Sequence, residues 1–457
     1  MPGGGLSFGG TGTQGDPWLI TSREDLIALA EFLNSGDATS YNNCDGCYFL
    51  QTADIDLTGV DWEPIGYSGS TCFAGNYDGG GHIIANAHSE GKADIDEKGN
   101  YSSTAGIFGW VAFGSVQKLH VKYANFVATG KNDYSYVGGI TGICYGASIK
   151  NCLVTDSSLE SKCNDNNNNC AGSIAGYSAG GTFNNCAAEN NRVTSMTYGG
   201  GFVGEVDDEN DGITTPSAFA NCYAADCVVT GFTPYTDGWS FIGGFAGQIT
   251  NEKPTAENCF VYRATLSTDG TSASNKSIGV FAGKLWGNPS AHYQSKIITQ
   301  NCFYGECGTT ENAEGAEQKT AEEFENGTVA KLLGDAFVQH GGSPSLSSKP
   351  ADYSAVDAAI AKANALNSDE YNNFSAVEAA VRAVVRGKPL SEQAEVDAMA
   401  KAIEDAIAAL EKKPVEMTVQ LPQTGDDSNL ALWTALLLVS GATIGMMMAG
   451  KKRNYGK

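Results

Sequence analysis

The sequence predicts a mainly β protein in which a parallel β-helix with a capping helix precedes a small three-helix bundle and a C-terminal transmembrane helix. A glycine motif that occurs six times between residues 105 and 302 predicts the β-helix, a solenoid of stacked rungs. A change to Ala, Glu and Lys at helical spacing from residue 351 predicts the bundle. A long apolar run near the end of the chain predicts the membrane helix.

The composition suits a large acidic protein with more than one hydrophobic core. The chain has 457 residues, of which 42% are apolar, and a formal net charge of −24. Because a phosphate-binding surface needs a basic stripe, this charge argues against nucleic acid as a partner. Glycine is abundant, with 57 residues against 12 prolines, which indicates many tight turns rather than a disordered, proline-rich stalk.

The repeat keeps a fixed spacing between its glycines, a cysteine and two apolar positions. The six copies of the glycine motif begin at Gly106, Gly138, Gly172, Gly200, Gly243 and Gly279. An Asn-Cys pair follows each of the later five copies, with its cysteine at Cys152, Cys186, Cys222, Cys259 and Cys302. Apolar residues recur two and seven positions past the cysteine, as Val154 and Leu159 do past the first. A pattern kept at these offsets, while the residues between vary, marks the inside of a coil.

A parallel β-solenoid accounts for this pattern, because strands this short are not stable alone. Rungs stacked at about 4.8 Å would supply the backbone hydrogen bonds and bury one continuous core. The glycines would lie at corners that need a positive φ, or where the next rung comes close. We therefore expect six rungs, with the asparagine before each cysteine in a hydrogen-bonded ladder and the five cysteines in a reduced, buried stack.

Two helical segments are expected to close the ends of the solenoid. Residues 22–33 form a predicted amphipathic helix with Ser22 as its N-cap. Its apolar face comprises Leu26, Ile27, Ala30 and Leu33. This helix would cover the first rung, where unpaired strand edges invite aggregation. Residues 320–337 would close the far end, so the predicted parts are a capped solenoid over 1–312 and a closure helix with linker over 313–350.

The glycine motif followed by Asn-Cys resembles the GLUG repeat of bacterial surface proteins. The lead-in strengthens the resemblance with Gly-Asp-Pro-Trp at 15–18, Ala-Asp-Ile-Asp-Leu at 53–57 and Asn-Tyr-Asp-Gly-Gly-Gly-His at 76–82. The likeness covers about residues 8 to 345. It implies that the β-helix is right-handed and that the protein lies at the cell surface, and it implies no single activity.

Three amphipathic segments with short connections predict the helical bundle over residues 351–412. Their apolar positions are Val356, Ile360 and Ala363, then Phe374, Val377, Val381 and Val384, then Val396, Met399, Ile403, Ile407 and Leu410. The sequence resembles a FIVAR module, a recurring unit of Gram-positive wall proteins. We expect it to act as a spacer. A sugar-binding role is the alternative for such modules, but no residues here single out a site.

The last part, residues 413–457, carries a short motif, an apolar run over 430–449 and a basic end. The motif consists of Leu421, Pro422, Gln423, Thr424 and Gly425, and the basic end of Lys451, Lys452 and Arg453. At about 1.5 Å per residue the run can cross a hydrocarbon core of roughly 30 Å, and the basic end would stay cytoplasmic.

This order resembles the LPXTG cell-wall sorting signal of Gram-positive surface proteins, the substrate of sortases. The resemblance implies that a sortase cysteine cleaves between Thr424 and Gly425 and joins the Thr424 carboxyl to peptidoglycan, after a stage in the membrane. The protein would then be displayed in the wall of a Gram-positive bacterium. Because export needs a signal peptide, and residues 1–5 have neither a basic nor an apolar region, we interpret the N-terminus as incomplete.

Thirteen cysteines in an exported chain raise the prospect of disulfides, and the odd count leaves at least one thiol unpaired. Loop pairs are better candidates than the stack. They are Cys163 with Cys170, Cys44 with Cys47 or Cys72, and the pairs five residues apart, Cys222 with Cys227 and Cys302 with Cys307. A zinc site at Cys44 and Cys47 is discounted because no second cysteine pair lies at a suitable spacing.

The inserts between rungs are where a solenoid would carry function. The acidic insert that starts at Glu205 and extends to Asp211 could bind Ca²⁺, but it lacks the spacing of a calcium loop, so a solvated loop without a cofactor is favoured. Trp239, Trp286 and Tyr145 could stack on sugar rings, although aromatic residues at corners also pack against the next rung.

The pattern favours a protein that is not an enzyme. A carbohydrate-cleaving β-helix needs paired carboxylates, and the nearest pair, Asp54 and Asp56, lies in the lead-in, where we expect a turn role. The five histidines are scattered, and neither H-E-x-x-H nor a Gly-x-Ser-x-Gly elbow occurs. We expect an adhesin that binds a host or environmental glycan, glycoprotein or matrix protein. The alternatives are a wall-bound carbohydrate-active enzyme and a structural spacer without a ligand.

Overall fold

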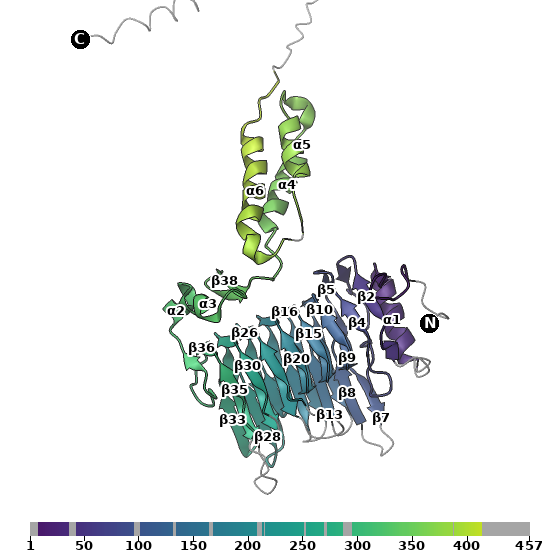
Figure 1. Cartoon of the computed structure of the whole chain (residues 1–457), viewed down its shortest axis with the longest axis vertical. Coiled ribbons are helices and arrows are strands. Elements are labelled where there is room, and N and C mark those ends of the chain that lie inside the picture. Colours follow the sequence, from purple (N-terminus) through teal and green to yellow (C-terminus); the bar gives the residue numbers. More distant parts are fainter. Residues whose placement is uncertain are drawn as a thin grey trace, which may run out of the picture.

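Short strands stacked in parallel make up most of the chain. The structure is a computed structural model that describes residues 8–35, 43–95, 101–130, 134–163, 168–207, 213, 215–250, 253–268, 272–286, 295–386 and 388–413. In this part of the chain a long β-solenoid carries a three-helix bundle on one side (Figure 1). The expected parallel β-helix is confirmed, and its right hand stays a prediction.

Five sheets run along the solenoid, and we number them in the order in which one rung passes through them. Sheet 1 contains β1 (Trp18–Ile20), β2 (Tyr48–Gln51), β4 (Asn76–Asp78), β10 (Ser115–Gln117), β15 (Ser148–Lys150), β20 (Thr182–Asn184), β25 (Ala218–Ala220), β30 (Thr255–Glu257) and β35 (Ile298–Gln300). Sheet 2 contains β3 (Ile55–Asp56), β5 (Ile83–Ala85), β11 (His120–Lys122), β16 (Leu153–Thr155), β21 (Ala187–Glu189), β26 (Tyr223–Ala225), β31 (Phe260–Tyr262), β36 (Phe303–Gly305) and β37 (Glu317–Gln318).

The other three sheets form the side of the solenoid that lies away from the bundle. Sheet 3 contains β6 (His88–Ser89), β12 (Asn125–Gly130), β17 (Ser158–Cys163), β22 (Arg192–Ser195), β27 (Val228–Gly231) and β32 (Thr265–Ser267). Sheet 4 contains β7 (Lys92–Ile95), β8 (Tyr101–Ala105), β13 (Tyr134–Gly138), β18 (Asn169–Gly172), β23 (Tyr198–Gly200), β28 (Trp239–Gly243) and β33 (Asn275–Gly279). Sheet 5 contains β9 (Phe108–Ala112), β14 (Thr141–Tyr145), β19 (Ala175–Ala179), β24 (Val203–Asp207), β29 (Ala246–Thr250) and β34 (Ala282–Trp286).

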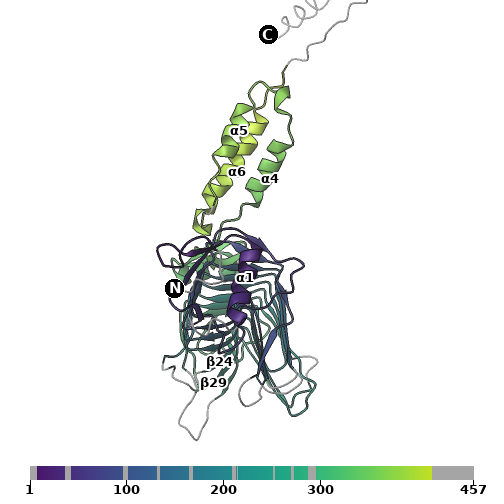
Figure 2. The ribbon, with the colours of Figure 1, turned by 90° about the vertical axis from the view of Figure 1, so that its right-hand side faces the viewer.

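The repeat sets the register of the stack. All pairs within these sheets are parallel except β7 with β8, and the six strands of sheet 5 match the six glycine motifs. The expected six rungs are too few, because the lead-in adds strands before the first motif and sheets 1 and 2 have nine strands each. Both predicted inward rows are buried, as Val154 and Leu159 show in one rung and Ala188 and Val193 in the next. Figure 2 shows the solenoid from its N-terminal end, with two legs that point away from the bundle.

Asparagine side chains form the expected ladder at the corner between sheets 1 and 2. Each residue adopts a left-handed φ of 50° to 54°, a conformation that asparagine tolerates better than most side chains. The amide of each donates to the carbonyl oxygen of the one before, at 2.9–3.2 Å, along the row Asn151, Asn185, Asn221, Asn258 and Asn301. The ladder joins five successive rungs.

A second polar corner, five residues further along each rung, was not anticipated. Asp156 accepts a hydrogen bond from Asn190 at 2.6 Å, and Asp226 accepts two from the Arg263 guanidinium at 2.6 and 2.7 Å. These residues also have a positive φ. Residues able to adopt that conformation recur at an offset of five from the asparagines, which is the signal that could have revealed this corner.

The cysteine stack is buried and its thiols are free, as expected. The described loop cysteines Cys44, Cys47 and Cys72 also carry free thiols, so the alternative disulfides among them do not form. Cys227 and Cys307 are likewise free, because each lies at a different corner from the stack cysteine five residues before it and points into the core. The side chain of Cys163 lies outside the described residues.

The capping helix is confirmed as α1 (Arg23–Asn34), at the N-terminal end of the solenoid (Figure 1). The Ser22 hydroxyl accepts a hydrogen bond from the Asp25 N–H, and the Asp25 carboxylate accepts one from the Ser22 N–H, which forms a capping box. Leu26, Leu29 and Leu33 are fully buried in the core of the solenoid.

The expected closure of the far end by residues 320–337 is wrong. Residues 320–346, which we call the side strap, form α2 (Ala321–Glu325), α3 (Thr328–Leu333) and an antiparallel hairpin of β38 (Phe337–His340) and β39 (Ser343–Leu346). The strap lies against the outer face of sheet 2, where Phe324 stacks on Tyr262 at 4.0 Å between ring centroids. The reason is that outward positions of sheet 2 are also apolar, as Tyr223 and Phe260 are, so that face needs a cover.

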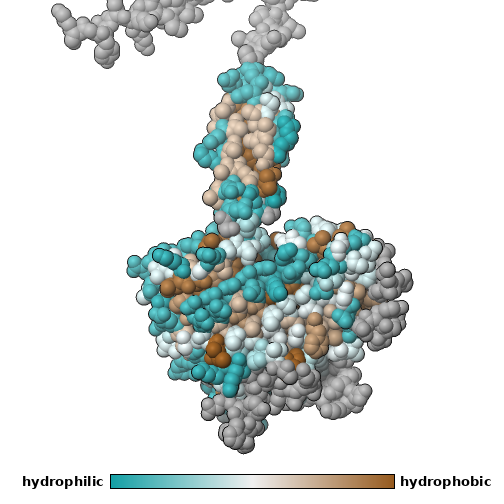
Figure 3. Space-filling view, in the orientation of Figure 1, coloured by the Kyte–Doolittle hydropathy of each residue, from teal (hydrophilic) through white to brown (hydrophobic). Residues whose placement is uncertain are grey.

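The three-helix bundle is confirmed, with α4 (Ser354–Asn364), α5 (Ser375–Arg382), α6 (Gln393–Ala408) and two short 3₁₀ helices, η3 (Ser368–Glu370) and η4 (Leu390–Glu392). Val356, Val377, Val396 and Ile403 fill its core. It stands on the side of the solenoid, across the direction in which the rungs stack (Figure 1). On this face, hydrophilic rows cross the solenoid and apolar residues form scattered patches (Figure 3).

Among the described residues, no helix is long and apolar enough to cross a bilayer. The predicted membrane segment at 430–449, the sorting motif at 421–425 and the basic end at 451–453 all lie outside the described residues. Membrane anchoring and wall sorting therefore stay predictions.

Candidate functional site

An aromatic pocket lies at the corner between sheets 5 and 1, near the N-terminal end of the solenoid. It has a volume of about 520 Å³. Its walls are the rings of Trp110, Phe113 and Tyr145, and the loop residues Asn43 and Asp45 line its other side. We call these five residues the aromatic pocket.

Successive rungs supply the three rings. Trp110 and Tyr145 point outward from β9 and β14, and Phe113 occupies the corner that follows β9. The Phe113 ring meets the Tyr145 ring edge-on, with centroids 5.5 Å apart and planes at 88°. The Trp110 and Tyr145 centroids are 6.5 Å apart. Such edge-to-face contacts are a favoured aromatic geometry, and they fix the ring directions.

Phe113 occupies a backbone conformation that suits glycine better. Its φ is 56°, and the equivalent corners of the next two rungs are Gly146 and Gly180, with φ of 56° and 61°. The left-handed region costs an L-residue roughly 1–2 kcal/mol. The Phe113 side chain is also 72% exposed, so core packing does not account for it. A strained, exposed aromatic residue marks a candidate functional position.

Two buried polar atoms at the pocket have no hydrogen-bond partner among the described residues. They are the indole Nε1 of Trp110, a donor, and the side-chain Oδ1 of Asn43, an acceptor. The Asn43 amide nitrogen is already used, because it donates to the Cys72 sulfur at 3.3 Å. Unpaired buried polar atoms cost about 1–3 kcal/mol each, so a ligand whose hydroxyl groups bonded to either atom would be favoured.

The electrostatics of the pocket suit a neutral ligand. Asp45 is the one charged residue among those that line it, and no basic side chain does. Cys72 lines the pocket, and Cys44 and Cys47 flank Asp45 closely in the sequence. A hydrogen bond from the Cys44 thiol lowers the pKa of Cys47, while burial raises the pKa of Cys72.

The structure brings two of the three predicted sugar-stacking residues together. Trp239 in β28 and Trp286 in β34 have ring centroids 5.3 Å apart, and each is 37% exposed. Tyr145, the third, belongs to the aromatic pocket instead, in the same row of sheet 5 as Trp286 but four rungs away. The sequence predicted these three aromatic residues as candidates, but not that two would pair and the third would lie in a separate pocket.

The lead-in carboxylates do not form a catalytic pair. Asp54 accepts hydrogen bonds from His82 Nδ1 at 3.1 Å and from the Ile83 N–H at 3.0 Å. Asp56 accepts hydrogen bonds from Thr58 and from the Asn86 amide, and these lower its pKa to about 2. Asp56 stabilises the turn at Thr58 and bonds to Asn86 of the next rung, and Asp54 bonds to His82 and Ile83 of the next rung. Both therefore have a structural role.

The acidic insert is not a solvated loop at its first residue. Glu205 is buried between sheets 4 and 5, where the Gln248 amide and the Cys170 thiol both donate to its carboxylate, at 3.1 and 3.2 Å. In the part of the chain that the structure describes, no three His, Cys, Asp or Glu residues come together as a metal site. Asp208, Glu209 and Asp211 lie outside it, so calcium binding stays a prediction.

Two of the scattered histidines meet in a groove of about 540 Å³ between sheet 2 and the bundle. The backbone N–H of His120 donates to the His82 carbonyl at 3.2 Å. Lys118 and Lys388 also line the groove, but each is already paired with a carboxylate. Because its basic groups are neutralised from within the protein, the groove is a weaker candidate than the aromatic pocket.

Comparison with known proteins gives no family. No family profile and no curated protein matches the chain. Among solved structures it is similar to a candidate immunoglobulin A1 protease from Bacteroides ovatus, with 20% identity, a TM-score of 0.48, and coverage of 74% of this chain and 94% of that one. It is also similar to a protein described as IgA1 protease, with 16% identity and a TM-score of 0.34, over 80% of this chain and 28% of that one.

The chain therefore spans less than a third of the second protein's length. Both neighbours are described as proteases, but likeness at this distance assigns no activity to this chain. The expectation that the protein is not an enzyme stays a prediction.

Proposed function

We propose that the protein is a surface-displayed β-solenoid that binds a neutral glycan through the aromatic pocket. The observation that carries the proposal is that one cavity is lined by three aromatic rings and by two residues, Trp110 and Asn43, whose buried donor and acceptor have no partner among the described residues. A sugar ring has an apolar face that stacks on aromatic side chains and hydroxyl groups that both donate and accept hydrogen bonds. The absence of basic side chains among the lining residues favours a neutral sugar over a sulfated or phosphorylated one.

A glycan array probed with the full chain tests the proposal. The wild-type protein should bind a defined set of neutral glycans. Phe113→Gly should remove the exposed ring, and Trp110→Phe should keep a ring but remove the indole donor, so both should lower the signal for the same glycans. Phe232→Ala is the matched control, because Phe232 is another exposed aromatic residue outside the pocket. A blank array, or equal signals from all four proteins, would overturn the proposal.

Display on the wall rests on the sequence of the tail. A Pro422→Ala variant should be lost from the peptidoglycan fraction, because the motif that resembles a sortase substrate is broken. Gln423→Ala should remain wall-bound, since the resemblance places no requirement on the third position. Retention of Pro422→Ala in the wall would refute sorting and leave glycan binding untouched.

A further inference from the structure

The five sheets of the solenoid end at different heights at its C-terminal end. Sheets 1 and 2 continue to β35 and β37, whereas sheets 3, 4 and 5 end at β32, β33 and β34. The described chain crosses this end once, where the carbonyls of Glu311 and Asn312 accept hydrogen bonds from the Val280 and Phe281 N–H groups. This crossing covers the corner between sheets 4 and 5, and the Asn312 amide reaches back to the Ser277 hydroxyl at 3.4 Å. No other strand among the described residues stacks on β32 or β33 at this end.

The core rows are incompletely buried at this end. Val229 in β27 and Ile242 in β28 are fully buried. The next members of the same rows, Leu266 in β32 and Ile278 in β33, are only partly buried. In each earlier rung, the following rung covers this apolar surface. In the last rung the same surface is partly exposed to water.

Backbone groups that no described strand pairs lie beside this apolar surface. In a parallel ladder, alternate residues bond to the strand before and to the strand after. The Thr265 N–H bonds back to Cys227, and Phe241, which is in register with Ser277, bonds back to Thr197. Leu266, Lys276 and Ile278 must therefore direct their N–H and C=O groups forward, where no strand follows in the part of the chain that the structure describes.

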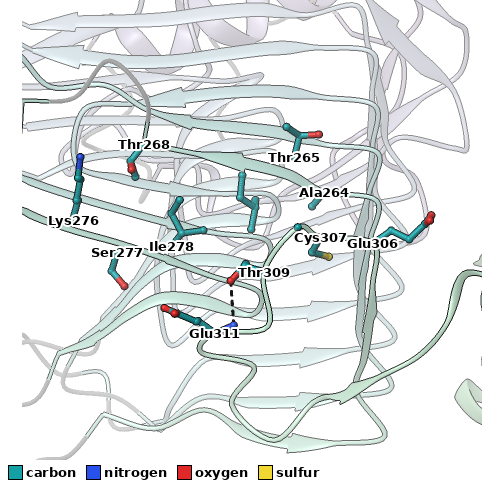
Figure 4. Close-up of a pocket in the computed structure, with 12 residues that line it drawn as sticks. Ala264, Thr265, Thr268, Lys276, Ser277, Ile278, Glu306, Cys307, Thr309 and Glu311 are labelled. Carbon is teal, nitrogen blue, oxygen red and sulfur yellow. Dashed lines mark hydrogen bonds between the residues drawn. The ribbon is translucent and has the colours of Figure 1, made fainter.

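These groups surround a recess of about 640 Å³ (Figure 4). Leu266 of sheet 3 and Lys276 and Ile278 of sheet 4 line the recess. The turn at Glu306–Glu311 also lines it, and the Glu311 N–H donates to the Thr309 hydroxyl at 3.2 Å. Because this turn borders a hollow, the end is not flat, and the blunt end of a second solenoid would not fill it. A single extended strand would.

We propose that the recess binds an extended peptide segment of a partner protein, which adds to β33 as the next strand of sheet 4. The strand would run parallel to β33, at about 4.8 Å from it, and would pair with the forward-facing groups of Lys276 and Ile278. β33 has five residues, so about five residues of the peptide would pair. Apolar side chains at alternate positions would cover Leu266 and Ile278.

The experiment uses the full chain and a fluorescent peptide with the sequence of residues 237–243, which contains β28, the strand before β33 in the sheet, and ends before the covered corner. Fluorescence anisotropy should give saturable binding. In the added strand, the N–H groups at the positions of Trp239, Phe241 and Gly243 would point toward β33. N-methylation at the Phe241 position should therefore lower affinity about tenfold or more, and N-methylation at the Ile242 position should leave it nearly unchanged.

A matched pair of protein variants tests the same contact from the other side. Lys276→Pro removes the forward-facing N–H without breaking the ladder to β28, and Lys276→Ala keeps it. Binding should weaken about tenfold in the first and stay within about twofold in the second. The proposal is overturned if the peptide does not bind, if the two methylated peptides bind equally, or if the two variants do. The methylated peptides decide the matter even if Lys276→Pro fails to fold.

Discussion

Replacement of Phe113 by glycine should abolish glycan binding and leave the solenoid about as stable as before. The two effects are separable because the Phe113 side chain is 72% exposed while its backbone lies at a φ of 56°, which the corresponding Gly146 and Gly180 also adopt. The substitution therefore removes the largest exposed wall of the aromatic pocket and places the residue that the corner prefers.

The opposing contributions to stability are similar in size. Relief of the left-handed conformation should stabilise the protein by roughly 1–2 kcal/mol. Loss of the edge-to-face contact with Tyr145 should cost about 0.5 kcal/mol, the lower end of the range for aromatic pairs, because the ring is exposed. The greater freedom of glycine in the unfolded chain should cost roughly another 0.4–1 kcal/mol. The net change in the free energy of unfolding should stay within about 1 kcal/mol.

The comparison with Phe113→Ala makes the reasoning testable. Alanine also loses the ring but keeps the strained φ, so it should be less stable than the glycine variant by about 1 kcal/mol. Urea unfolding of the solenoid, followed by tryptophan fluorescence, measures the difference. If the alanine variant is as stable as the glycine variant, or if the glycine variant still binds glycan, the account of this corner is wrong.

Three further outcomes are expected. Asn221→Ala should destabilise the solenoid by about 1 kcal/mol more than Asn301→Ala in chemical unfolding, because Asn221 makes two ladder bonds and Asn301 makes one. Equal destabilisation by the two variants would contradict the ladder. Burial lowers the pKa of His120 to about 4. Between about pH 6.5 and 4 the unfolded state therefore binds more protons than the folded state. The free energy of unfolding should fall by up to about 3 kcal/mol as the pH drops through this range. His120→Gln should flatten that dependence in unfolding curves at pH 4.5 and 7, and an unchanged slope would assign it to other groups. Iodoacetamide should label Cys47 before Cys186, because Cys47 is half-buried and has a lowered pKa whereas Cys186 is buried. Peptide mass spectrometry measures the order of labelling. The reverse order would contradict the burial of the cysteine stack.

The repeat could be predicted because its residues are local signals of a long-range arrangement. The Asn-Cys spacing fixed a corner, and the inward rows at two and seven residues past the cysteine fixed the core. The aromatic pocket could not be predicted in the same way, because Asn43 comes from the lead-in and Trp110 from the first rung, and nothing in the spacing places them together. The unusual position of Phe113 could have been noticed in the sequence, because the corresponding residues of the following rungs are Gly146 and Gly180.

The side strap was missed for a related reason. The strands of sheet 2 carry a second apolar row, at the position directly after each cysteine, where Tyr223, Phe260 and Phe303 lie. The predicted inward rows do not include this outward row. A strand that is apolar on both faces is covered on both faces. The sequence of residues 320–337 indicates helices but not which surface they cover, because an amphipathic helix fits the end of a solenoid as well as its side.

The strap also decides how a pulling force would enter the molecule. The chain leaves the last rung at β37, folds back over sheet 2 as the strap, and reaches the bundle beyond Lys349, which is ion-paired with Glu189 at the side of the solenoid. Tension on the bundle thus acts first on that ion pair and on the packing of Phe324 and Phe337, before it reaches any rung. Under tension we therefore expect the strap to detach first and lengthen the connection to the bundle while the stacked rungs stay folded.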